Sequence, residues 1–217
     1  LIWAITGLGQ DTPEPQTVVV MITPTPQAVA PIEEEPDFTS SMAAALESNK
    51  VYSDTFAENS IGWPEGDGPV VRQVTDGEYQ ILVQVPDKAV STVPDDLSLY
   101  NNFRYQLDAT LADGQPESGY GMVFYRRNSN NYYVFAVNGL QQWSIWRLED
   151  GQWQELRNLP DDQTWTNSDA VLPPGETNQL ILEAYGGDFN LFVNGKGLGR
   201  VSDNNAPETG GLIGMYV

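Results

Sequence analysis

The stretch that most constrains the fold of this chain is residues 120–147, where three runs of aromatic and β-branched residues are joined by two Asn-rich turns. Tyr, Phe, Trp and Val suit a pleated, half-buried surface. Asn and Gly accept the positive φ angles that tight hairpins require. The pattern therefore predicts consecutive strands over 120–127, 132–137 and 143–147.

The same pattern continues through the rest of residues 51–217. Short β-prone runs recur about every 8–12 residues, and turns such as Asp76-Gly77 and Asn194-Gly195 separate them. Many short strands with this punctuation indicate an all-β sandwich of antiparallel sheets. Further strands are expected at 70–74, 79–85, 97–111, 178–185, 189–193 and 210–217.

The charge and the absent residue types exclude several functions. The net charge is −20, from 30 acidic and 10 basic residues. This argues against nucleic-acid binding, which needs clustered Lys and Arg. The chain has no Cys and no His, which excludes disulfides, thiolate metal sites and any Ser-His-Asp triad. Arg126, Arg127, Arg147 and Arg157 are expected to form local surface ion pairs. The alternative is that they pair with acidic residues of a neighbouring subunit, including its acidic N-terminal segment.

Motifs spread over residues 54–217 resemble a known group of folds. They are Asp54-Thr55-Phe56 with Trp63, Gly121-Met122-Val123-Phe124, Tyr132-Tyr133-Val134-Phe135, Asn178-Gln179-Leu180, Phe192-Val193-Asn194-Gly195 and Gly211-Leu212-Ile213-Gly214. On these residues the chain resembles the concanavalin A-like, or laminin G-like, jelly rolls, and in particular bacterial surface domains related to the 3-keto-disaccharide hydrolase domain family. The resemblance implies a jelly-roll β-sandwich. It leaves function open, because this group includes glycan-binding modules, glycosidases, adhesion domains and spacers.

The first 50 residues have a different character. Pro and Thr dominate residues 10–37, which favours an extended backbone, and no Lys or Arg precedes Lys50. Ala and Leu, with Ser before them and Asn after them, predict a short helix over 39–49. We therefore expect an extended segment over 1–37, the helix within 38–50, and the sandwich over 51–217.

Residues 1–8 are hydrophobic, but no stretch of the chain is long enough to form a membrane-spanning helix. We interpret residues 1–8 as a processed N-terminus or as the end of an upstream apolar segment. Either interpretation indicates export to the cell surface or the extracellular space.

A β-prone run at 17–23 interrupts the Pro/Thr-rich segment. Left exposed, it would be an aggregation hazard, so it needs a partner strand. Two placements are open: a short strand against its own domain or a neighbour in a crystal, or donation to the sheet of another subunit. For the second placement the predicted subunit-contact residues are Val18, Val19, Val20, Met21 and Ile22.

Acidic residues suggest two kinds of site. The resemblance implies that laminarinase-like glycosidases of this superfamily would carry a Glu-x-Asp-x-x-Glu run, which this sequence lacks, so we expect no enzyme; a glycoside hydrolase is the third alternative. Calcium binding through loop oxygens is possible, and otherwise we expect no cofactor. The candidate calcium ligands are Asp113, Asp161, Asp162, Asp203 and Asn204.

Tryptophans offer platforms for sugar rings. Trp143 and Trp146 are three residues apart on one predicted strand, so they face opposite sides and at least one belongs to the core. Trp153 and Trp165 lie in or beside predicted loops, which makes them the candidate glycan-binding residues.

Two functions follow. The first is a non-catalytic, exported surface protein that self-associates, or joins another surface protein, through its N-terminal strand to build an assembly or filament. The alternative is a carbohydrate-binding, lectin-like module tethered to the cell surface.

Overall fold

The computed structural model describes residues 16–21, 53–86, 88–95, 99–160 and 163–217. The helix predicted at 39–49, and the Pro/Thr-rich segment apart from 16–21, lie outside these residues. Within them, no helix is long and apolar enough to cross a membrane.

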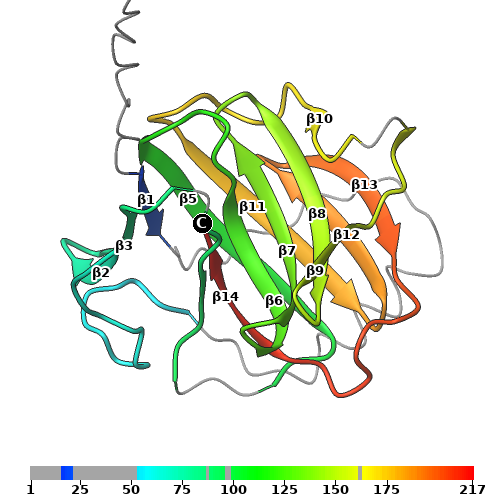
Figure 1. Cartoon of the computed structure of the whole chain (residues 1–217), viewed down its shortest axis with the longest axis horizontal. Helices are drawn as coiled ribbons and strands as arrows, with labels where there is room; N and C mark the ends of the chain where they lie inside the picture. The colour runs from blue at the N-terminus through cyan, green and yellow to red at the C-terminus, as the bar shows by residue number, and fades with distance from the viewer. Residues whose placement is uncertain (1–15, 22–52, 87, 96–98, 161–162) are drawn as a thin grey trace, which may run out of the picture.

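Antiparallel strands build the fold, which confirms the predicted all-β sandwich (Figure 1). Sheet A has the order β13-β12-β11-β5-β1-β3-β2, and sheet B has the order β10-β8-β7-β6-β14-β4 with β9 also paired to β8. The strands are β1 (Gln16–Met21), β2 (Val70–Thr75), β3 (Glu78–Val83), β4 (Ser91–Thr92), β5 (Phe103–Asp113), β6 (Tyr120–Asn128), β7 (Asn131–Asn138), β8 (Gln142–Glu149), β9 (Gln152–Glu155), β10 (Thr166–Asn167), β11 (Thr177–Tyr185), β12 (Asp188–Val193), β13 (Lys196–Ser202) and β14 (Leu212–Tyr216).

The predicted hairpin turns lie where Asp-Gly or Asn-Gly pairs occur. Asp76 and Gly77 have φ angles of 52° and 79°, and Asn194 and Gly195 have φ angles of 51° and 77°. Positive φ at both central residues matches the right-handed twist of the strands that a two-residue turn joins. The strand expected from residue 97 begins only at Phe103.

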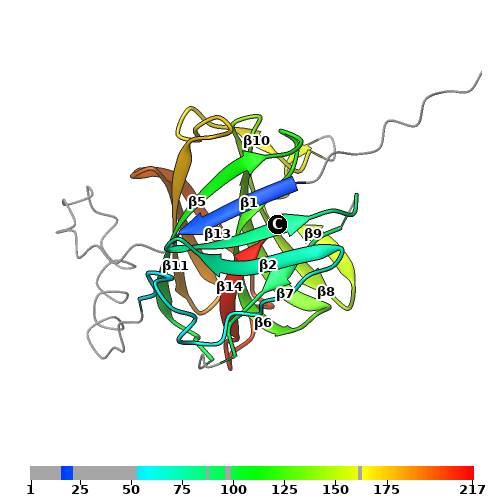
Figure 2. The same cartoon turned by 90° about the vertical axis from the view of Figure 1, so that its left-hand side faces the viewer.

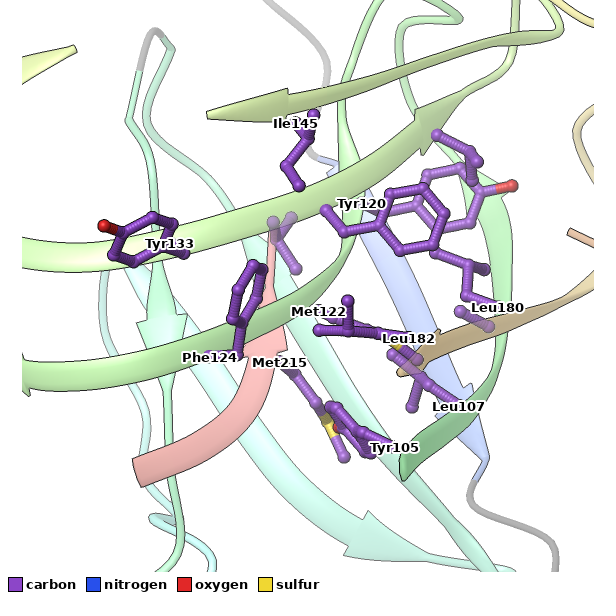
Figure 3. Close-up of a cluster of buried hydrophobic side chains, with 14 of the residues drawn as sticks. Tyr105, Leu107, Tyr120, Met122, Phe124, Tyr133, Ile145, Leu180, Leu182 and Met215 are labelled. Atoms are coloured by element: carbon purple, nitrogen blue, oxygen red, sulfur yellow. The ribbon is translucent and has the colours of Figure 1, made fainter. Parts of the chain in front are cut away.

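The core lies between the two sheets. Strands of sheet A alternate: along β5 every second side chain from Phe103 to Leu111 is buried. Figure 3 shows these side chains from β5 and β11 meeting those of sheet B. The labelled residues are Tyr105, Leu107, Leu180 and Leu182 from sheet A, and Tyr120, Met122, Phe124, Tyr133, Ile145 and Met215 from sheet B.

The central strands of sheet B do not alternate. β7 is buried from Tyr132 to Asn138 without a break. Its two faces belong to different clusters: Tyr133 and Phe135 lie in the core, whereas Tyr132 and Val134 belong to a second apolar cluster. Sheet B is therefore covered on its outer face as well as on its inner face.

The N-terminal strand lies in the middle of sheet A. β1 is antiparallel to β3 and β5, with Val19 opposite Gln80 on one side and Thr110 on the other, and Figure 2 shows it beside β5. The expected docking on a neighbouring subunit is not supported: β1 pairs within its own chain. The physical reason is that β3 and β5 would otherwise face each other with unpaired backbone groups. Of the predicted subunit-contact residues, Val18, Val19, Val20 and Met21 lie in β1, and Ile22 lies outside the described residues.

A buried ionic cluster ties the end of β13 to β7 and β8. Asp203 accepts hydrogen bonds from Arg147 Nη1 at 2.8 Å and from the Tyr133 hydroxyl at 2.9 Å. The Asp203 and Arg147 side chains are 7% and 10% exposed, so their pairing differs from the surface ion pairs that we expected of the arginines. Burial alone would raise the Asp203 pKa, but the Asn205 N–H, Tyr133 and Arg147 outweigh burial and hold this pKa below its usual value.

We predict that Asp203→Ala lowers the free energy of unfolding by about 3 kcal/mol at neutral pH, because it leaves Arg147 buried without its main partner. Since the folded-state pKa of Asp203 is lowered, its contribution is present above the ordinary carboxyl pKa of about 3.9 and is lost as the pH falls through the folded value. Urea unfolding of both proteins between about pH 7 and pH 3 would check this. The gap between them should shrink towards acid pH.

The matched control is Asp169→Ala, which removes an exposed ion pair with Lys196. It should change stability little, because solvent screens an exposed pair. If both variants lose the same stability, the cluster around Asp203 has no special role.

Candidate functional site

Aromatic rings cover the outer face of sheet B, and we call this surface the aromatic face. Trp146 contacts Trp165 with ring centroids 4.8 Å apart and Trp153 at 6.4 Å. Tyr132 contacts Trp153 at 5.7 Å, and Tyr216 contacts Trp153 at 6.3 Å. All four contacts are edge-to-face, the arrangement that the ring quadrupoles favour. The rings therefore form one connected surface. Beneath them lie Val123, Val134, Ala136 and Leu148.

Strand periodicity explains how β8 contributes to this face. Side chains alternate along a strand, so Trp143 and Trp146 point to opposite sides. Trp143 is 7% exposed and belongs to the core, whereas Trp146 packs against the outer cluster. This confirms the prediction that the two residues face opposite sides. Trp153 lies opposite Leu148 in the β8–β9 pair and shares its face.

The contact between Trp153 and Tyr216 shows that sheet B curls towards the aromatic face. Trp153 lies on β9 and Tyr216 lies on β14, with β8, β7 and β6 between them. Strands four places apart in a flat sheet are separated by about 19 Å. A ring separation of 6.3 Å thus requires the edges of the sheet to approach each other. Sheet B therefore curves around the aromatic face, and the rings fill the space inside this curve.

The two predicted glycan-binding residues both lie on this face. Trp153 is 45% exposed and is more exposed than the other rings of this face. Trp165 is partly buried against Trp146. Tyr132, Trp146 and Tyr216 were missed as candidates. The odd spacing from Trp143 was the available signal for Trp146, but the tyrosines lie on other strands, and only the sheet order places them here. The role of these residues in binding stays a prediction.

A buried arginine holds the loop that carries Trp165. Arg157 stacks over the Trp143 ring, with 4.2 Å from its guanidinium carbon to the ring centroid, and pairs with Glu155. It also donates to the Thr164 carbonyl at 2.8 Å and to the Thr166 hydroxyl at 2.9 Å. Hydrogen bonds on both sides of Trp165 position that ring against Trp146.

Polar groups border the aromatic face near β4. Arg126 Nε donates to Ser91 Oγ at 3.1 Å, and the Tyr132 hydroxyl hydrogen-bonds to Ser91. Ser91 lies opposite Tyr216 in the β4–β14 pair. Burial raises the pKa of both Tyr132 and Tyr216, so both hydroxyls stay protonated at neutral pH and can donate hydrogen bonds.

The structure separates two of the candidate calcium ligands. Asp113 ends β5, whereas the Asp203 N–H bonds to Gly187, beside the β11 end that pairs with Phe103. β5 has 11 residues from Phe103 to Asp113 and spans about 33 Å, so these two carboxylates cannot share an ion. Asp203 is also engaged by Arg147. The other candidates are Asn204, in the loop after β13, and Asp161 and Asp162, which lie outside the described residues.

No group of three or more acidic side chains that could hold a metal occurs within the described ranges. Calcium binding therefore stays a prediction without a located site. Two acids around the β8–β9 hairpin also have partners: Glu149 lies 3.1 Å from Arg147, and Glu155 pairs with Arg157.

Comparison with known proteins shows the fold. No protein-family profile matches the chain, and no curated protein matches it. Among solved structures, the carbohydrate binding module CBM66 from Bacillus subtilis matches with a TM-score of 0.55 and 16% sequence identity, over 72% of this chain and 87% of that chain. Sheep galectin-11 in complex with glycerol matches with a TM-score of 0.41 and 17% identity, over 55% of this chain and 84% of that chain. The match to the carbohydrate binding module confirms the jelly-roll β-sandwich fold; the resemblance to the 3-keto-disaccharide hydrolase domain family is not confirmed.

Proposed function

We propose that this chain is a non-catalytic carbohydrate-binding module of an exported or cell-surface protein, and that it binds sugars on the aromatic face. The observation that carries the proposal is the exposed Trp153 ring, held in place by contacts with three other aromatic rings. The fold shared with a carbohydrate binding module is compatible with this function, but a shared fold does not select a function. The argument therefore depends on the face itself.

The chemistry of Trp153 suits a sugar. A pyranose has an apolar C–H face and a polar rim of hydroxyls. The C–H face can stack on the apolar face of an aromatic ring, while the hydroxyls bond to polar groups around that ring. Tyr132, Trp146 and Tyr216 hold Trp153 from several sides. Little side-chain entropy is then lost when a ligand stacks on it.

We predict that Trp153→Ala weakens glycan binding at least about tenfold, because truncating a buried aromatic anchor commonly costs 2 kcal/mol or more. A glycan array would identify a bound sugar, and titration calorimetry would then compare the affinities. Circular dichroism should show an unchanged fold, since Trp153 is half exposed.

The matched control is Tyr185→Ala, which removes an aromatic side chain that is 38% exposed at the end of β11 in sheet A. It should leave glycan affinity unchanged. Absence of any glycan ligand, or equal loss in the two variants, would refute the proposed site.

A second candidate role is self-association through β1. One observation favours it: β1 fills a place between β3 and β5 rather than extending an outer edge. Residues 22–52 separate β1 from the rest of the domain, and a chain of that length can reach about 100 Å when extended. The β1 of one copy could therefore occupy the same place in another copy, which is strand addition by exchange.

To test this role, a chain that lacks residues 1–21 would be titrated with a labelled peptide of residues 13–24. We expect the peptide to bind, and the Val19→Pro peptide to bind much more weakly, because proline has no N–H for the strand pairing. Two differently tagged full-length chains, refolded together, should co-purify. Equal binding of the two peptides, or full-length chains that never co-purify, would reject exchange.

A further inference from the structure

We propose that the aromatic face selects anionic sugars, and that Arg126 binds their carboxylate or sulfate group. This inference rests on the proposed sugar-binding function and names the class of sugar. Its basis is an arginine beside the aromatic face that the chain's own acidic groups leave unpaired.

Four of the seven arginines form ion pairs within the described residues, whereas Arg72, Arg126 and Arg127 do not; of these three, Arg126 borders the aromatic face through its hydrogen bond to Ser91. Arg104 pairs with Glu183, Arg200 pairs with Asp188, and Arg147 and Arg157 have buried partners. Within the part of the chain that the structure describes, Arg126 has no carboxylate within ion-pair distance, although the sequence holds 30 acidic residues.

The Arg126 side chain is fixed at one atom and open at the others. Its Nε donates to Ser91 Oγ at 3.1 Å. No described residue accepts a hydrogen bond from its Nη1 or Nη2. A guanidinium presents these two nitrogens as a planar fork that matches the two oxygens of a carboxylate, or two oxygens of a sulfate. Holding Nε orients the fork before any ligand arrives.

A chain of contacts connects Arg126 to the exposed tryptophan. Ser91 accepts from Arg126 and hydrogen-bonds to the Tyr132 hydroxyl. The Tyr132 ring in turn contacts Trp153. An oligosaccharide that stacks one ring on Trp153 can therefore present an acidic substituent, on that ring or the next, to Arg126.

The acidity of the chain does not prevent such binding. Charges further away than about 8 Å are largely screened at physiological ionic strength, so a direct contact with Arg126 outweighs the diffuse negative charge. A hydrogen bond to a charged group is also stronger than one between neutral groups. The net charge of −20 instead disfavours anionic sugars on other parts of the surface.

The test compares three probes by titration calorimetry with the full chain. They are an oligomer of galacturonic acid, the same oligomer with its carboxylates reduced to alcohols, and a sulfated galactose oligomer. We expect either anionic oligomer to bind at least about tenfold more tightly than the reduced one, because hydrogen bonds between a guanidinium and an anion are stronger than those to a neutral hydroxyl.

The variant pair is Arg126→Gln and Arg127→Gln. Arg127 is the next residue of β6 and is exposed. Its substitution removes the same charge, and none of the described residues forms a hydrogen bond or an ion pair with its side chain. Arg126→Gln should remove the preference for the anionic oligomers while leaving affinity for the reduced oligomer unchanged. Arg127→Gln should keep the preference.

The outcomes separate this inference from the proposed function. If neutral and anionic oligomers bind equally and binding depends on Trp153, sugar binding holds and anion selection is wrong. Equal effects of the two arginine variants would also overturn it, since they would indicate general charge rather than a contact. If no sugar binds at all, both ideas fail. A preference for only one anionic oligomer that Arg126→Gln abolishes would identify the carboxylate or the sulfate as the natural group.

Discussion

The structure depends on the burial of sheet B on both of its faces. The inner face packs on sheet A, and the outer face carries Val123, Val134 and Leu148, which none of the described strands covers with a second layer. Exposed apolar surface of this kind is costly in water. The rings of the aromatic face cover it, and each edge-to-face pair adds about 0.5–1.5 kcal/mol beyond the area that it buries. The candidate binding surface is thus also a structural layer, with Trp153 as its exposed outermost ring.

Much of the fold was predictable because its signals are local. Turn residues such as Asp76-Gly77 and the run of aromatic residues over 120–147 determine strands and hairpins between sequence neighbours. The predicted positions of Trp143 and Trp146 on opposite faces followed from the period of a strand alone. Trp153 and Trp165 were identified as candidates from another local signal, because they lie in or beside predicted loops.

The rest of the site depends on contacts between residues far apart in sequence. Arg126 and Ser91 are separated by 35 positions, and Arg147 and Asp203 by 56. No periodicity shows that β9 and β14 approach each other, because the curvature of sheet B comes from its order and twist. Asp113 and Asp203 were chosen as calcium candidates by residue type and loop position, which say nothing about the distance between them in the fold. Two residues of the same type need not lie near each other in the fold.

Motifs that identify a fold can have a purely structural role. Asp54 accepts hydrogen bonds from the Phe56 backbone N–H and from the Trp63 indole, at 2.8 and 2.9 Å, and Asn178 bonds to the Tyr120 hydroxyl at 2.9 Å. These residues carried the family resemblance, yet they lie buried in the sandwich. Buried polar groups must be satisfied for the sandwich to be stable, and these hydrogen bonds meet that need independently of what the surface binds. Functional differences between such sandwiches therefore arise on exposed faces, where the placement of one ring or one unpaired arginine can change the ligand without disturbing the core.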